Sequence, residues 1–257
     1  ITLRHFCENL KVVYFPNANL VMLIGTFIIT AIIVNKFGSK SIIKANTLLV
    51  PLILVTMIII FIFSTKEASI SRFFPILGNG FNQTFVKGML NIYSFGGLIY
   101  LYLITSDLKN IQDYKKVGIA SILLSAGYLL LSVTSLLTLF PFLVNGSNVL
   151  SIYLSTRTIR LGKFLPRIDT IFMFTWIFNF LLYLSIIMYY IKKLNIETFG
   201  IKNKSIVLYL TAIIIFIISM MFQNSLQLNF LETKIYKYLA LFMVFVYSPT
   251  ILIVGYI

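Results

Sequence analysis

The sequence predicts an all-α, polytopic membrane protein, and three observations support this prediction. The first is that 59% of the 257 residues are hydrophobic, with a mean hydropathy of +0.97. The second is that only 11% are charged, against about 25% in soluble domains. The third is that the apolar residues form long runs, not the alternating segments of about ten residues that are typical of transmembrane β-strands.

Seven stretches reach the length of about 20 mostly apolar residues that a membrane-spanning helix needs. They are Asn19–Asn35, Thr47–Thr65, Thr84–Thr105, Val117–Val144, Asp169–Ile191, Ser205–Phe222 and Ile235–Ile257. Ile1–Phe15 has the pattern of the end of an earlier helix followed by its exit from the membrane. We therefore expect residues 1–257 to form a single integral membrane domain whose first helices lie upstream.

Lysines between these stretches predict the orientation, because short cytoplasmic loops are enriched in Lys and Arg. Three compact loops fall on one side, with Lys36, Lys40 and Lys44, then Lys109, Lys115 and Lys116, then Lys192, Lys193, Lys202 and Lys204. A longer loop with Arg157, Arg160, Lys163 and Arg167 falls on the other side and conflicts with this assignment. We give the three compact loops more weight and place them in the cytoplasm.

The polar residues argue against an enzyme and against a nucleic-acid-binding protein. The net charge is +14, but the basic residues lie between apolar runs and form no continuous polar surface. One cysteine, Cys7, and one histidine, His5, cannot supply a His/Cys metal site. The sequence has no catalytic triad pattern, phosphate loop or metalloprotease motif. We expect no cofactor and no metal.

The third stretch contains a Gly96–Gly97 pair at mid-membrane depth, in the run Lys87–Leu98. Two glycines weaken a helix. A broken membrane helix is tolerated where it lines a cavity or is buried in protein, and in transporters such breaks present backbone groups to the substrate. The alternative is that the glycines allow close packing between helices.

The fifth stretch carries a second candidate surface. Phe172, Trp176, Asn179 and Tyr183 are spaced four, three and four residues apart and therefore share one helix face. This face suits a small amphipathic ligand, or else Asn179 bonds a neighbouring helix and the aromatic residues pack. No apolar stretch has an Asp, Glu, Lys, Arg or His at its centre, so the proton relay that pumps usually need is not visible in these stretches.

Two regions of the sequence resemble the spore germination permease family. The segment Ser155–Asp169 resembles the family signature at Arg157, Arg160, Leu161, Gly162, Phe164, Arg167 and Asp169. The segments Phe74–Gly80, Lys87–Gly88 and Ser94–Gly97 resemble the family's loop and its broken sixth helix. Lys163 and Pro166 depart from the pattern, because acidic residues are more usual there.

The resemblance implies a fold similar to that of the amino acid–polyamine–organocation transporters, a LeuT-like bundle of five plus five helices in inverted repeats. On this mapping the seven stretches are the fourth to tenth helices, and about the first three are missing. The implied ligand site comprises Tyr93, Ser94, Phe95, Gly96 and Gly97, with Phe172, Thr175, Trp176 and Asn179 as further candidates.

The resemblance also implies a function. Such proteins are expected to sense a small nutrient, usually an amino acid, as the B subunit of a germinant receptor in the spore inner membrane. The implied partners are a membrane A subunit and a lipoprotein C subunit. Two other hypotheses stay open, an amino acid permease or exchanger of the same superfamily and a membrane protein that only anchors a partner.

Overall fold

The computed structural model describes residues 1–64, 69–74, 80–89, 111–139, 168–222 and 224–250, together with single positions 97, 103 and 253. Every regular element in these residues is helical, which confirms the predicted all-α class. The chain divides into two compact units. The first comprises Ile1–Ala68 and Leu143–Ser225, and the second comprises Ser69–Phe142 and Leu226–Ile257.

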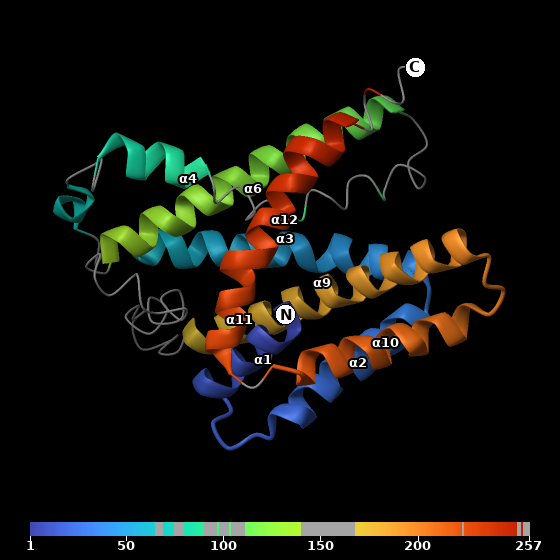
Figure 1. Cartoon of the computed structure of the whole chain (residues 1–257). Coiled ribbons are helices and arrows are strands. Elements are labelled where there is room, and N and C mark those ends of the chain that lie inside the picture. The colour runs from blue at the N-terminus through green and yellow to red at the C-terminus, as the bar shows by residue number, and fades with distance from the viewer. Residues whose placement is uncertain are drawn as a thin grey trace. The chain divides into compact units, whose positions relative to one another are not determined.

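The first unit is built around one long helix. Its helices are α1 (Thr2–Val13), α2 (Leu20–Lys36), α3 (Ser39–Ser64), α9 (Ile168–Phe199) and α10 (Lys204–Met220). Helix α9 packs against α2, α3 and α10, while α1 lies against α2 and α10 (Figure 1). Segments that are far apart in the sequence therefore share one core.

Polar residues and glycines mark where these helices begin and end. Asn19 accepts a hydrogen bond from the Val21 amide at 2.9 Å and caps α2, and Asn203 caps α10 in the same way. Gly200 follows α9 with a φ of +63°, and Gly38 lies between α2 and α3 with a φ of +85°. Glycine adopts this left-handed conformation without the steric penalty that a Cβ brings, so both chain reversals are short.

The core of the first unit is formed by four of these helices. Its buried residues are Leu3, Phe6, Cys7, Leu10, Ile24, Phe27, Ile28, Ala31, Phe180, Leu184, Met188, Leu208 and Ala212. Those from α1 recur at spacings of three and four, and those from α9 at spacings of four, so each helix presents one face to the others. This core holds the N-terminal helix α1 against α9.

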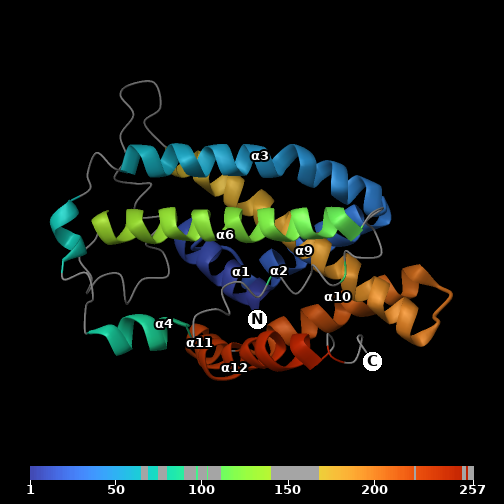
Figure 2. The same ribbon diagram turned by 90° about the horizontal axis from the view of Figure 1, so that it is seen from above.

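The second unit contains α6 (Ile111–Leu139), which is one continuous helix (Figure 2). The 3-10 turn η2 (Ile70–Phe73) is tied to the end of α6, because Arg72 Nη1 donates to the Thr138 carbonyl at 2.7 Å. The remaining elements are η3 (Asn82–Val86), α4 (Lys87–Met89), α11 (Ser225–Leu231), η6 (Glu232–Tyr236), α12 (Lys237–Phe242) and η7 (Met243–Tyr247). The elements η3, η6 and η7 are π-helical turns.

Three helical segments within the described residues are long and apolar enough to cross a bilayer: Ser39–Phe63, Gln112–Leu139 and Asp169–Phe199. In the most apolar 18-residue stretch of Gln112–Leu139, only 11% of the residues are buried. In the corresponding stretch of Ser39–Phe63, 18% are buried. Lipid is the environment in which such exposed apolar helices are stable. Leu20–Lys36 and Lys204–Met220 are shorter apolar helices. The protein is therefore a membrane helix bundle.

The helices differ in extent from the predicted stretches. Helix α3 begins at Ser39 rather than Thr47, and α9 continues to Phe199 rather than ending at Ile191. Lys192 and Lys193 therefore lie on a helix and not in a loop. The helix can continue beyond the apolar core because long lysine side chains reach polar surroundings from it. The stretch Thr84–Thr105 and the end of Ile235–Ile257 fall largely outside the described residues, so seven spans stay a prediction.

Candidate functional site

Five aromatic residues form a cluster where α1, α2 and α9 meet: Phe6, Phe27, Phe172, Trp176 and Phe180. The Phe6 ring stacks on Phe180, with centroids 3.9 Å apart and planes within 5°. Phe6 also lies 4.6 Å from Trp176 and meets Phe27 edge-on at 5.3 Å. Phe172 lies 5.9 Å from Trp176 on the same helix. We refer to these residues as the aromatic cluster.

The cluster forms because α1 carries an apolar stripe. Leu3, Phe6, Cys7 and Leu10 are all at most 6% exposed, and their spacing places them on one face of the helix. Cys7 is fully buried as a free thiol and packs as a small apolar residue. Burying this stripe against α9 brings the Phe6 ring into the cluster.

The predicted ligand face of α9 is divided between the core and the surface. Phe172 is buried at 4% exposure and Trp176 is half-buried, whereas Asn179 is exposed and Tyr183 is 37% exposed. The structure therefore places Trp176 beside Phe6 and Phe172 next to Trp176. It does not bring Asn179 into that group.

Two polar residues near the start of α9 are held by backbone contacts. Thr175 is buried, and its hydroxyl donates to the carbonyls of Ile171 and Phe172 at 3.1 and 2.9 Å. The backbone carbonyl of Asp169 accepts a hydrogen bond from the Tyr14 hydroxyl at 3.2 Å, which ties the start of α9 to the end of α1. The Asp169 residue is itself only 8% exposed.

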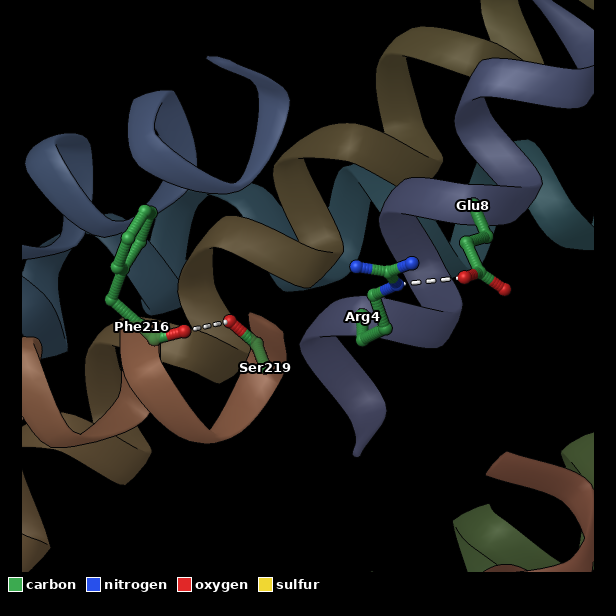
Figure 3. Close-up of polar contacts among 4 residues, drawn as sticks. All are labelled: Arg4, Glu8, Phe216 and Ser219. Carbon is green, nitrogen blue, oxygen red and sulfur yellow. Dashed lines mark hydrogen bonds and ion pairs between the residues drawn. The ribbon is translucent and has the colours of Figure 1, made fainter. Parts of the chain in front are cut away.

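A charged pair lies within the first unit on α1. Arg4 Nε donates to Glu8 Oε1 at 2.6 Å, and the side chains are only 10% and 17% exposed. Figure 3 shows the two side chains meeting along α1, while on α10 the Ser219 hydroxyl donates to the Phe216 carbonyl at 2.8 Å. A charge-assisted bond of this kind is stronger than a neutral one. Helix α1 thus supplies ionisable groups that the apolar stretches lack at their centres.

Several predicted site residues lie outside the described residues. They are Tyr93, Ser94, Phe95 and Gly96, and the signature positions Arg157, Arg160, Leu161, Gly162, Phe164 and Arg167. Gly97 is described, and a Cβ built there would meet none of the described heavy atoms within 4 Å. The described part of the chain therefore shows no close helix contact at Gly97.

Sequence reasoning overlooked the contribution of α1 and α2. The residues it missed are Phe6, Phe27 and the Arg4–Glu8 pair. The first ten residues did carry a signal, namely apolar positions at helical spacing beside oppositely charged residues four apart. Phe27 had no such signal, because α2 is apolar on every face and its own sequence does not indicate which side is buried.

The aromatic cluster suits the apolar part of a small amphipathic molecule. Aromatic rings provide apolar contact area of defined shape, and a half-buried Trp176 gives the cluster an accessible edge. The Arg4–Glu8 pair lies on another face of α1, because Phe6 is two residues from both Arg4 and Glu8 and residues two apart on a helix do not face each other.

Comparison with known families places the chain in a family. The spore permease family, described as spore germination protein, matches residues 1–227. This range includes α1, α2, α9 and α10, and hence the whole aromatic cluster. No curated protein and no solved structure matches the chain.

Proposed function

The chain belongs to the spore germination protein family, and from this membership we propose that it is the nutrient-sensing membrane subunit of a spore germinant receptor. The family match over residues 1–227 is the observation that carries this proposal. The nutrient is a small amino acid, and the partners are the A and C subunits of the receptor. The site of action is the inner membrane of the spore.

We place the nutrient beside Trp176 and Phe172, next to the Phe6 ring of α1. Thr175 shapes this region indirectly, because its hydroxyl already bonds its own helix.

Sensing requires that the ligand bind two conformations with different affinity, since only then does it shift their equilibrium. The contacts of Phe6 provide such a difference. A ligand that inserts at Trp176 changes how the Phe6 ring packs between Trp176 and Phe180. Because packed aromatic rings interdigitate, that change displaces α1 relative to α9. The partner subunits then receive the displacement.

Trp176 makes this proposal directly testable, because it is the only tryptophan in the chain. Intact protein in lipid nanodiscs is titrated with single amino acids while tryptophan emission is recorded. We expect a saturable change with one nutrient class, and the Trp176→Phe variant, which has no tryptophan, supplies the background emission of the titration. Phe172→Leu should weaken the apparent affinity about tenfold, a loss of about 1.4 kcal/mol. Phe178→Leu is the matched control, because Phe178 is 45% exposed on the same helix.

Spores supply the physiological test. Deletion of the gene should abolish the germination response to one nutrient while amino acid uptake by growing cells is unchanged. Normal germination on every nutrient, together with an absence of any emission change over a broad amino acid panel, contradicts the proposed function.

An amino acid permease or exchanger is the second candidate function, and the Arg4–Glu8 pair favours it. Ionisable groups inside a membrane protein often serve in transport pathways and proton relays. Purified protein in liposomes should then accumulate labelled amino acid, and Glu8→Gln should reduce the rate. An absence of flux in liposomes that still show the Trp176 emission change supports the receptor function instead.

A further inference from the structure

Lysines gather at one end of the first unit. Three lie in residues 36–44, where α2 turns into α3, and four lie in residues 192–204, where α9 turns into α10. Glu197 is the one acidic residue in these two segments, so they carry a net formal charge of +6 (seven Lys minus one Glu). We call residues 36–44 and 192–204 the lysine-rich end.

Contacts between helices bring the two segments together. The Lys36 ammonium lies 5.3 Å from the centre of the Tyr209 ring, which joins the end of α2 to the first turns of α10. The Lys192 ammonium lies 5.3 Å from the Tyr189 ring on α9. At a rise of 1.5 Å per residue, Lys192 lies about 10 Å before the end of α9 and Tyr209 about 8 Å after the start of α10. The two residues are therefore at similar distances from the turn between α9 and α10. The lysine and tyrosine side chains of these contacts thus lie at a similar distance from the turn between α9 and α10.

Large apolar side chains project among the lysines. Phe37 is 72% exposed and Phe199 is 71% exposed, both at chain reversals of the lysine-rich end. A soluble anion has no apolar part that could contact these phenyl rings. A phospholipid offers both a phosphate for the ammonium groups and acyl chains for the phenyl rings, and tyrosines and lysines are the residues that anchor helices at this depth.

We propose that the lysine-rich end is a binding surface for anionic phospholipids of the adjacent leaflet. The phosphates sit between Lys36, Lys192 and Lys204, while Phe37 enters the upper acyl region and Phe199, seven residues beyond Lys192 along α9, lies on the headgroup side. Each lysine near an anionic surface adds to the attraction, and the net charge leaves that attraction almost unopposed by acidic neighbours. Bound lipid holds α2, α9 and α10 at a fixed depth and so stabilises the unit that carries the aromatic cluster.

The test measures thermal stability of the intact protein in detergent with added lipid. Phosphatidylglycerol should raise the midpoint of unfolding by several degrees more than zwitterionic phosphatidylcholine does. The triple variant Lys36→Gln/Lys192→Gln/Lys204→Gln should lose at least half of that difference. High salt should reduce the wild-type difference, because exposed charges are screened within about 10 Å at 0.1 M salt.

Matched controls separate this surface from a general effect of charge. The triple variant Lys87→Gln/Lys234→Gln/Lys237→Gln removes the same charge from the second unit, at positions that the predicted topology places on the opposite side of the membrane, and should keep the wild-type difference. If the first triple variant does not fold, the same lipid-dependent difference in unfolding midpoint is measured for Lys192→Gln alone and for wild type over a series of salt concentrations. Both should reduce the difference. An equal loss in both triple variants, a wild-type difference that salt leaves unchanged, or an equal stabilisation by soluble glycerol phosphate overturns the proposal.

Discussion

Asn35 at the end of α2 donates a hydrogen bond from Nδ2 to the backbone carbonyl of Ser185 in α9, at 3.0 Å. The same amide donates to the Ala31 carbonyl at 2.9 Å, and the Asn35 side chain is almost completely buried. A buried polar side chain with defined partners specifies one alignment of two otherwise apolar helices. Asn35 therefore fixes the register between α2 and α9, and with it the position of Phe27 beside Phe180.

Replacing Asn35 should loosen this alignment. We expect Asn35→Ala to lower the free energy of unfolding by about 1 kcal/mol, the typical net value of one hydrogen bond. Asn195→Ala is the matched control, because Asn195 donates to Ile191 within its own helix. Thermal unfolding of both variants in the same detergent measures the difference, and an equal loss in both variants contradicts a role for Asn35 in helix register.

Removing the Phe6 ring should destabilise the first unit strongly. Phe6→Ala deletes the stack on Phe180 and the contacts with Trp176 and Phe27, and truncation of a buried phenylalanine costs about 3–5 kcal/mol. Phe174→Ala, at a position that is 52% exposed on α9, should cost much less. Denaturant unfolding followed by Trp176 emission compares them, and similar losses would show that α1 does not pack on α9 as described.

Breaking the Arg4–Glu8 pair one partner at a time should be worse than removing both. Arg4→Leu or Glu8→Leu leaves a poorly exposed charge without its partner, which costs more than the loss of the pair itself. A double-mutant cycle with Arg4→Leu/Glu8→Leu should give a coupling free energy of about 1–3 kcal/mol. A coupling close to zero would mean that the two charges are effectively solvated.

Cys7 should resist labelling in the folded protein. It is the only cysteine in the sequence and is fully buried, and a reagent reacts with thiolate that it can reach. N-ethylmaleimide should label wild type only after denaturation. The variant Cys7→Ser/Val12→Cys should be labelled without denaturation, because Val12 is 68% exposed on the same helix. Rapid labelling of native Cys7 contradicts the packing of α1.

Composition and hydropathy determined the class of this protein without reference to any neighbour. A chain with so few charged residues and such long apolar runs can cover its surface only with lipid, and helices satisfy their own backbone hydrogen bonds there. The apolar runs located α2 and α10 closely, because each of these helices begins and ends within two residues of its apolar run. The ends of α3 and α9 were missed, since lysines continue those helices beyond the apolar core.

Tertiary structure decided which faces meet. Phe172 and Trp176 share a helix face with Asn179 and Tyr183, yet only the first two join the aromatic cluster. The partner ring, Phe6, lies on a short helix at the far end of the sequence. A helix that is apolar on all sides does not indicate from its own periodicity which side is buried. Only the packing of α1 and α2 onto α9 selects that side, because the rings must interdigitate without voids.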